Sequence, residues 1–165
     1  MRNKSNDKNH DRIVDLLYSL VKDDKKTYKE THDDSTINPI HIHVGREVVP
    51  YHPDIWAKTR KKNEIDIYEV WNTEDERSAC SDILHAACTD NIRSLSIVCV
   101  RNPRFKDPWT VKYAKTICRV FLDHLRNKSG ALLLEITEVY FAEIGKDDIK
   151  DDNKIKRSLK AQLDF

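Results

Sequence analysis

Two acidic residues, Asp54 and Glu69, lie in two extended segments that flank a basic turn. Side chains alternate across a strand, so each carboxylate belongs to one defined face of its segment. If the turn is centred on residues 61–62, residues whose numbers sum to 123 face each other, and Asp54 lies opposite Glu69. Directly opposed side chains are about 5 Å apart, and two carboxylates at that distance repel unless they share a proton or a cation. Mg²⁺ or Mn²⁺ would satisfy the pair, polarise a phosphate and activate a water molecule.

A shifted register is the competing interpretation of this hairpin. A slip of one residue moves every side chain of a strand to the other face, so one of the two carboxylates would point to solvent. The spacing alone does not choose between the two registers. The paired carboxylates are therefore a hypothesis that depends on the observed ladder.

The same residues resemble the core motif of a known nuclease superfamily. Pro53-Asp54, followed fifteen residues later by Glu69-Val70-Trp71, is similar to the motif of the PD-(D/E)xK superfamily, whose restriction-endonuclease-like fold includes Holliday-junction resolvases. The resemblance covers residues 11–100 best. It implies that Asp54 and Glu69 are metal ligands, and that Asp15 of the first helix adds to the metal site. It also implies a Mg²⁺- or Mn²⁺-dependent DNA endonuclease, which is a phosphodiester hydrolase.

The chain departs from this motif at Trp71, where the family has a lysine that positions the attacking water and neutralises charge on the phosphate. Three interpretations follow. Another residue takes the role of the lysine, with His52, Lys58 and Arg77 as candidates; His52 would share a face with Asp54 and lie opposite Trp71. Alternatively, the site binds metal or DNA without cutting. In the third interpretation the site is vestigial, and the fold serves a structural or partner-binding role.

The charge distribution bears on nucleic-acid binding. Lys+Arg number 29 against 28 Asp+Glu, so the chain is not the globally basic protein that is typical of nucleic-acid binding. Residues 101–128 nevertheless carry eight Lys/Arg against two Asp. With the basic turn, they predict two patches that contact a phosphate backbone. The residues concerned are Arg60, Lys61, Lys62, Arg104, Lys112, Lys115 and Arg119.

Two other groups of possible ligands have simpler interpretations. His41, His43 and Glu47 have the H-x-H-x-x-x-E spacing of a cupin metal site, but the glycines that flank that motif are missing, and histidines on a half-exposed strand are favoured. The four cysteines form no C-x-x-C pair and are expected to be buried free thiols.

Hydrophobic periodicity and turn residues predict the elements that position these side chains. We expect a disordered segment over 1–10, a helix over 12–22, a charged loop over 22–36 and strands over 40–49, 52–59 and 64–71, the last two joined by a turn at 60–63. A helix from a Thr73/Glu76 capping box to about residue 90, a strand over 94–100, a helix over 107–125, a strand over 131–144 and an amphipathic tail helix within 146–165 follow. This order predicts a single α/β domain, 1–165, with a mixed central sheet flanked by helices and a restriction-endonuclease-like core.

The remaining expectations concern location and partners. No apolar run approaches the roughly 20 residues of a membrane helix, and the first residues are polar, so a cytoplasmic protein is expected. DNA is the expected partner, and apolar residues of the tail helix could form a homodimer interface. The alternative function is a catalytically inactive module on the same fold that binds nucleic acid or a protein.

Overall fold

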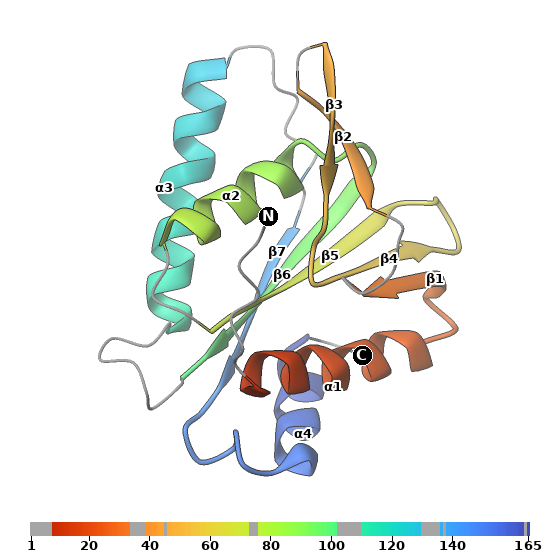
Figure 1. Ribbon diagram of the computed structural model, residues 1–165, viewed down its shortest axis with the longest axis vertical. Coiled ribbons are helices and arrows are strands. Elements are labelled where there is room, and N and C mark those ends of the chain that lie inside the picture. Colours follow the sequence, from red (N-terminus) through yellow and green to blue (C-terminus); the bar gives the residue numbers. More distant parts are fainter. Residues whose placement is uncertain are drawn as a thin grey trace.

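The computed structural model describes residues 8–33, 39–44, 46–72, 76–101, 110–129, 136, 138–163 and 165. Its elements, shown in Figure 1, are α1 (Lys8–Asp23), β1 (Tyr28–Asp33), β2 (Ile40–Val44), β3 (Glu47–Tyr51), β4 (Ile55–Thr59), β5 (Ile65–Trp71), α2 (Glu76–Ala87), β6 (Ile92–Val100), α3 (Val111–Ser129), β7 (Glu138–Ile144) and α4 (Asp152–Leu163).

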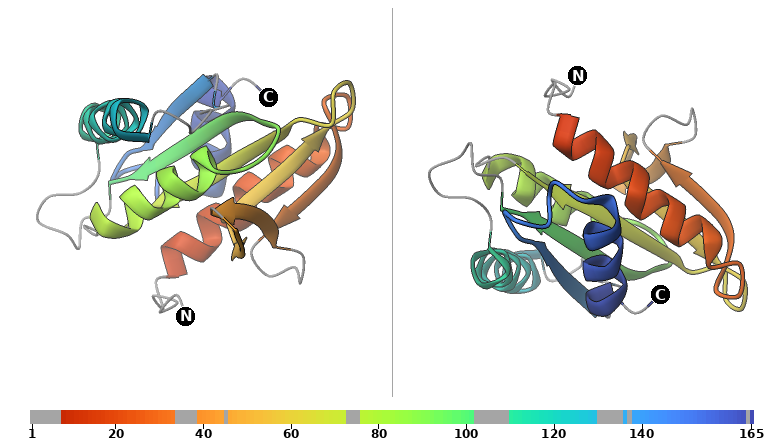
Figure 2. Two further views of the ribbon diagram at one scale, coloured as in Figure 1. Left: turned by 90° about the horizontal axis from the view of Figure 1, so that it is seen from above. Right: turned by 90° about the horizontal axis from the view of Figure 1, so that it is seen from below.

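Five strands form one mixed sheet in the order β1-β4-β5-β6-β7. The β1–β4 and β4–β5 pairs are antiparallel, whereas the β5–β6 and β6–β7 pairs are parallel. Helices α2 and α3 and the separate β2–β3 hairpin lie on one side of this sheet, and α1 and α4 lie on the other (Figures 1 and 2). The predicted α/β class, with a mixed central sheet between helices, is confirmed.

Each side of the sheet has its own hydrophobic core, because side chains alternate along the strands. In β5, Ile67 and Trp71 pack on the side of α2 and α3. Tyr68 and Val70 pack on the side of α1 and α4, where they meet buried residues of both helices. The odd-numbered residues of β5, Glu69 among them, therefore belong to the side that the hairpin and α2 cover.

Two predictions about the first strands are wrong. Residues 28–33, predicted to be part of a charged loop, form the edge strand β1. Only its first residue is fully buried, so the strand lacks the alternation that sequence analysis relies on, and its charged residues suit an exposed sheet edge. The predicted strand over 40–49 is instead the β2–β3 hairpin, which reverses between Val44 and Glu47. The predicted alternation of helices and strands is kept only because β1, rather than residues 40–49, supplies the first strand of the sheet.

The helices are close to prediction. Helix α1 starts at Lys8, so residues 8–10, predicted to be disordered, are helical. Helix α2 ends at Ala87, three residues earlier than expected. Helix α3 extends to Ser129, and the predicted start at residues 107–108 lies outside the described residues. Thr73 of the capping box and residues 131–135 of the predicted last strand lie outside them as well.

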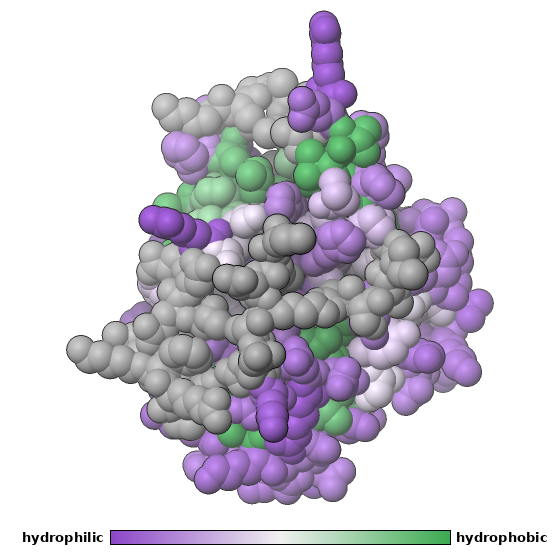
Figure 3. All heavy atoms as spheres, in the orientation of Figure 1, coloured by the Kyte–Doolittle hydropathy of each residue, from purple (hydrophilic) through white to green (hydrophobic). Residues whose placement is uncertain are grey.

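The tail helix α4 contributes to the core of its own chain. Ile155 and Leu159 are fully buried with α1 and β7, so these residues do not supply the predicted dimer interface. Figure 3 shows a mainly hydrophilic surface over α4, and both hydrophilic and hydrophobic surface over the hairpin. None of the described helices is long and apolar enough to cross a membrane.

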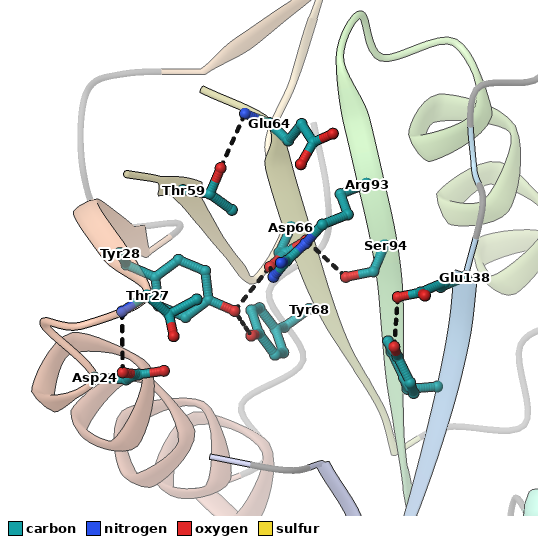
Figure 4. A network of polar contacts seen from close by, with 11 residues as sticks. Asp24, Thr27, Tyr28, Thr59, Glu64, Asp66, Tyr68, Arg93, Ser94 and Glu138 are labelled. Carbon is teal, nitrogen blue, oxygen red and sulfur yellow. Dashed lines mark hydrogen bonds and ion pairs between the residues drawn. The ribbon is translucent and has the colours of Figure 1, made fainter. Parts of the chain in front are cut away.

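A buried polar network ties β1, β5 and β6 together on the α1 side of the sheet (Figure 4). The Asp66 carboxylate accepts hydrogen bonds from Tyr28 at 2.8 Å, from Arg93 Nε at 2.8 Å and from Ser94 at 2.7 Å. The Tyr28 and Tyr68 hydroxyls are also hydrogen-bonded to each other at 2.7 Å. Burial, reinforced by the charges of Tyr68 and Asp66, raises the pKa of Tyr28 far above its usual value. A buried carboxylate with this many donors is fully compensated, so we interpret the network as structural.

Replacing Tyr28 by Phe should lower the free energy of unfolding by about 1–2 kcal/mol at neutral pH, because a donor to a buried carboxylate is lost. Since Tyr28 ionises only in the unfolded chain above pH 10, its contribution to stability is present below that pH and is lost as the pH rises. The difference between wild type and Tyr28→Phe should therefore shrink above pH 10, by up to about 1.4 kcal/mol per pH unit. Urea denaturation at several pH values measures both effects.

The matched control is Tyr140→Phe, because the Tyr140 hydroxyl donates to Glu138 on an exposed part of β7. This variant should change the free energy of unfolding by less than about 0.5 kcal/mol. Equal effects of the two substitutions would contradict the structural role of the Asp66 network.

Candidate acidic site between β4, β5 and α2

The β4–β5 ladder has the register of a turn centred on residues 61–62, one of the two that the sequence left open. Its partners are Ile55 with Tyr68, Trp56 with Ile67, Ala57 with Asp66 and Lys58 with Ile65, so that every pair sums to 123. Two hydrogen bonds between Thr59 and Glu64 close the turn. The shifted register is therefore wrong. Asp54 directly precedes the first ladder pair, which places it at the level of Glu69.

Asp54 lies at the end of the ladder and is only 1% exposed. Its Oδ2 atom accepts a hydrogen bond from the backbone N–H of Val70 at 2.7 Å. Pro53 precedes it and has no N–H to give to a ladder, so the pairing of β4 with β5 stops here. The side chain of Asp54 thus takes over from the backbone in joining β4 to β5.

Glu69 is fully buried on the side of the sheet that the hairpin covers. Tyr51, the last residue of β3, donates its hydroxyl to Glu69 Oε1 at 2.5 Å. Burial raises the pKa of Tyr51 well above its ordinary value, and the negative charges of Glu69, Asp82 and Asp54 raise it further. All three carboxylates are therefore near one phenol; we call Asp54, Glu69 and Asp82 the acidic cluster.

Asp82 joins the acidic cluster from α2, and the sequence analysis missed it. Its exposed fraction is 6%, and Trp71 donates its indole N–H to Asp82 Oδ2 at 3.2 Å. Trp71, at the position of the motif lysine, is thus a neutral hydrogen-bond donor within the site. The spacing of Ala79, Asp82 and Ala86 at helical intervals was a signal that Asp82 faces inward.

His10, in the first turn of α1, contacts the acidic cluster through Asp54. Its Nε2 atom is 3.4 Å from Asp54 Oδ2. Burial alone would lower the pKa of His10, but the hydrogen bond and charge of Asp54, followed by those of Asp11, outweigh it and raise the pKa. His10 was not predicted as a site residue, because residues 1–10 were expected to be disordered. Tyr51 was not predicted either, because residues 40–49 were expected to form a single strand that ends before it.

The other predicted site residues are more exposed than the acidic cluster. Asp15 is exposed on α1, which meets Asp54 through His10 instead. His52 is exposed and precedes the ladder, so its predicted position opposite Trp71 stays a prediction. Arg77 is exposed in the first turn of α2, whereas Lys58 is half-buried in β4.

Most of the predicted phosphate-binding residues are exposed. Arg104 lies outside the described residues. The exposed ones lie at the β4–β5 turn and on α3: Arg60, Lys61, Lys62, Lys112, Lys115 and Arg119. Their side chains are therefore available to a ligand in solution.

The structure also bears on the other candidate ligands. His41 and His43 are exposed on β2, and a mixed α/β sheet is not the fold of a cupin. All four cysteines are free; Cys99 and Cys118 are buried, and burial raises the pKa of Cys118 to about 12. Among the described residues, no group of three or more His, Cys, Asp or Glu side chains is arranged to hold a metal ion.

Comparison with known proteins identifies no relative of this chain. No family model matches it, and neither a curated protein nor a solved structure does. The function is therefore inferred from the acidic cluster and the surfaces around it.

Replacing Tyr51 by Phe should lower the free energy of unfolding by about 1.5–3 kcal/mol, because a charge-assisted hydrogen bond to the buried Glu69 is lost. Tyr18→Phe on α1 is the control, since it removes a hydroxyl and keeps the ring that contacts Lys22. Chemical denaturation of both variants at neutral pH is the measurement. A loss below about 0.5 kcal/mol for Tyr51→Phe would show that the Tyr51–Glu69 contact does not stabilise the fold.

Proposed function

We propose that the chain is a metal-dependent endodeoxyribonuclease with a restriction-endonuclease-like fold, related to the PD-(D/E)xK superfamily. The observation that carries the proposal is the acidic cluster. Asp54 and Glu69 lie at one level of two paired strands and are both buried, and Asp82 adds a third carboxylate from α2. Buried carboxylates of like charge are costly unless a proton, a donor or a cation compensates them.

The topology supports the fold in this proposal. After α1, the strands β1, β4 and β5 pair in an antiparallel arrangement, and α2 then leads to β6, which is parallel to β5. This is the α-β-β-β-α-β core that the resemblance implies, with the β2–β3 hairpin as an insertion. Glu69 then lies in the central strand β5, and Asp54 directly precedes the neighbouring strand β4.

The carboxylate oxygens of the acidic cluster are suitable ligands for Mg²⁺ or Mn²⁺. Both ions prefer oxygen ligands, and Mg²⁺ is commonly held by only one or two carboxylates, with water and substrate phosphates completing its coordination. Two carboxylates are thus sufficient, although the described residues include no three-ligand group. Asp54 and Glu69 would hold the ion. When bound, it would polarise the scissile phosphate and activate a water molecule.

Residues of the chain have to replace the missing lysine. Lys58 is on the same face of β4 as Trp56, which packs on the α2 side of the sheet, and its flexible amine could approach a bound phosphate. Arg77 and His52 are exposed and remain candidates for the same role. The basic residues of the β4–β5 turn and of α3 would bind neighbouring phosphates along DNA.

Cleavage of supercoiled and four-way-junction DNA in Mn²⁺ tests the proposal directly. The wild type should cut, and Asp54→Asn and Glu69→Gln should each lower the rate by about 100-fold or more, because the charge that holds the cation is lost. Glu138→Gln, a substitution on an exposed part of β7, is the matched control and should cut at the rate of the wild type. Cleavage that survives both cluster substitutions would exclude this site as its source.

Metal binding is measured separately by thermal unfolding. At a Mn²⁺ concentration 100 times the dissociation constant, binding stabilises by about 2.7 kcal/mol, or roughly 5–10 °C for a chain of this size. The wild type and Glu138→Gln should show this shift, and Asp54→Asn should not. An equal shift in Asp54→Asn would place the cation elsewhere.

A catalytically inactive DNA-binding module is the second candidate, and a specific observation favours it. Tyr51 and Trp71 donate to Glu69 and Asp82, so donors of the protein already compensate part of the acidic cluster. Such a module should show no cleavage, no Mn²⁺ shift and a DNA affinity that falls by about ten- to hundredfold between 50 and 200 mM salt, as expected for two to four phosphate contacts. A partner-binding protein without affinity for DNA would fail this last test.

A further inference from the structure

Two aromatic rings are stacked on the strands next to the acidic cluster. His32 of β1 and Trp56 of β4 are partners in the antiparallel ladder. Their ring centroids are 4.2 Å apart, and their planes differ by 22°. Both side chains are only half-buried, so the pair keeps exposed aromatic surface.

The position of this pair relates it to the proposed site. Trp56 packs with the core on the α2 side of the sheet, whereas its neighbours Ile55 and Ala57 pack on the α1 side. Trp56 is therefore on the side that carries the acidic cluster. It lies two residues from Asp54, a separation of about 6.6 Å along an extended chain.

Basic residues follow Trp56 along the same side of β4 and form with Trp56 and Asp54 a row of side chains. Lys58 follows Trp56 on the same side of β4, and the exposed Arg60, Lys61 and Lys62 form the turn that comes next. From the turn toward Asp54, the row thus changes from cationic to aromatic to acidic. This is the order of groups that a nucleic-acid strand would need, with phosphates on the cations and a base on the rings.

We propose that the His32–Trp56 pair stacks on an unpaired base of single-stranded DNA, whose backbone runs from the β4–β5 turn toward the acidic cluster. This inference rests on the proposed function and gives it a substrate class. An unpaired base exposes its face to an aromatic ring, whereas in a duplex the faces are covered by neighbouring base pairs. The pair therefore selects unpaired over paired DNA.

The test compares the affinities of a labelled oligothymidylate and of a duplex of equal length, measured by fluorescence anisotropy at low salt in EDTA, which prevents metal-dependent cleavage. The wild type should prefer the single strand. His32→Ala should weaken single-strand binding by about five- to tenfold, as expected for one lost stacking contact, and leave duplex binding unchanged. His32→Phe, which keeps an aromatic ring and removes the ionisable group, should restore single-strand binding.

His41→Ala is the matched control, because His41 is an exposed histidine on the neighbouring hairpin. It should bind both ligands as the wild type does. Equal binding by His32→Ala and the wild type, or an equal loss for single strand and duplex, would overturn the stacking proposal and leave the proposed DNA binding intact. Failure of the wild type to bind either ligand would overturn both.

Discussion

The register of β4 against β5 is the constraint on which the rest of this structure depends. Side chains alternate across a strand, so a slip of one residue would move Glu69 to the α1 side and Asp66 to the α2 side. The closed turn between Thr59 and Glu64 fixes the register at one end. The hydrogen bond from Val70 to Asp54 fixes it at the other. Both polar clusters of the molecule follow from this single alignment.

The two clusters show two ways of burying carboxylates. Asp66 has a guanidinium, a phenol and a hydroxyl as donors, and Arg93 supplies a full positive charge next to it. The acidic cluster holds three carboxylates, and its partners include a phenol, an indole, a backbone amide and the imidazole of His10. Arg93 places fixed positive charge beside the first carboxylate, whereas His10, whose pKa is raised, despite its burial, by its contact with Asp54, places an ionisable group beside the second cluster. Ionisable groups that perturb one another's pKa are typical of functional sites, and this is the physical reason for assigning function to the second cluster.

The β2–β3 hairpin forms part of the surroundings of the second cluster. The hairpin packs on the α2 side of the sheet and brings Tyr51 onto Glu69. Helix α1 brings His10 to Asp54 from a different part of the chain. The cluster is thus built where β3, the start of β4, β5 and two helices approach one another, and its residues come from distant parts of the chain.

Local signals in the sequence predicted several of the helices and strands. Hydrophobic periodicity located α1, α3 and α4, and alternation and turn residues located β5. The basic turn limited the pairing of β4 with β5 to two registers, and only the structure chose the one that places Asp54 at the level of Glu69. Only the tertiary structure decided which polar segments become ordered and which side chains meet. The edge strand β1 is polar and buries little, so its order depends on pairing with β4. The meeting of His10, Tyr51 and Asp82 depends on how α1, the hairpin and α2 pack on the sheet, because contacts between distant segments leave no periodic pattern in the chain.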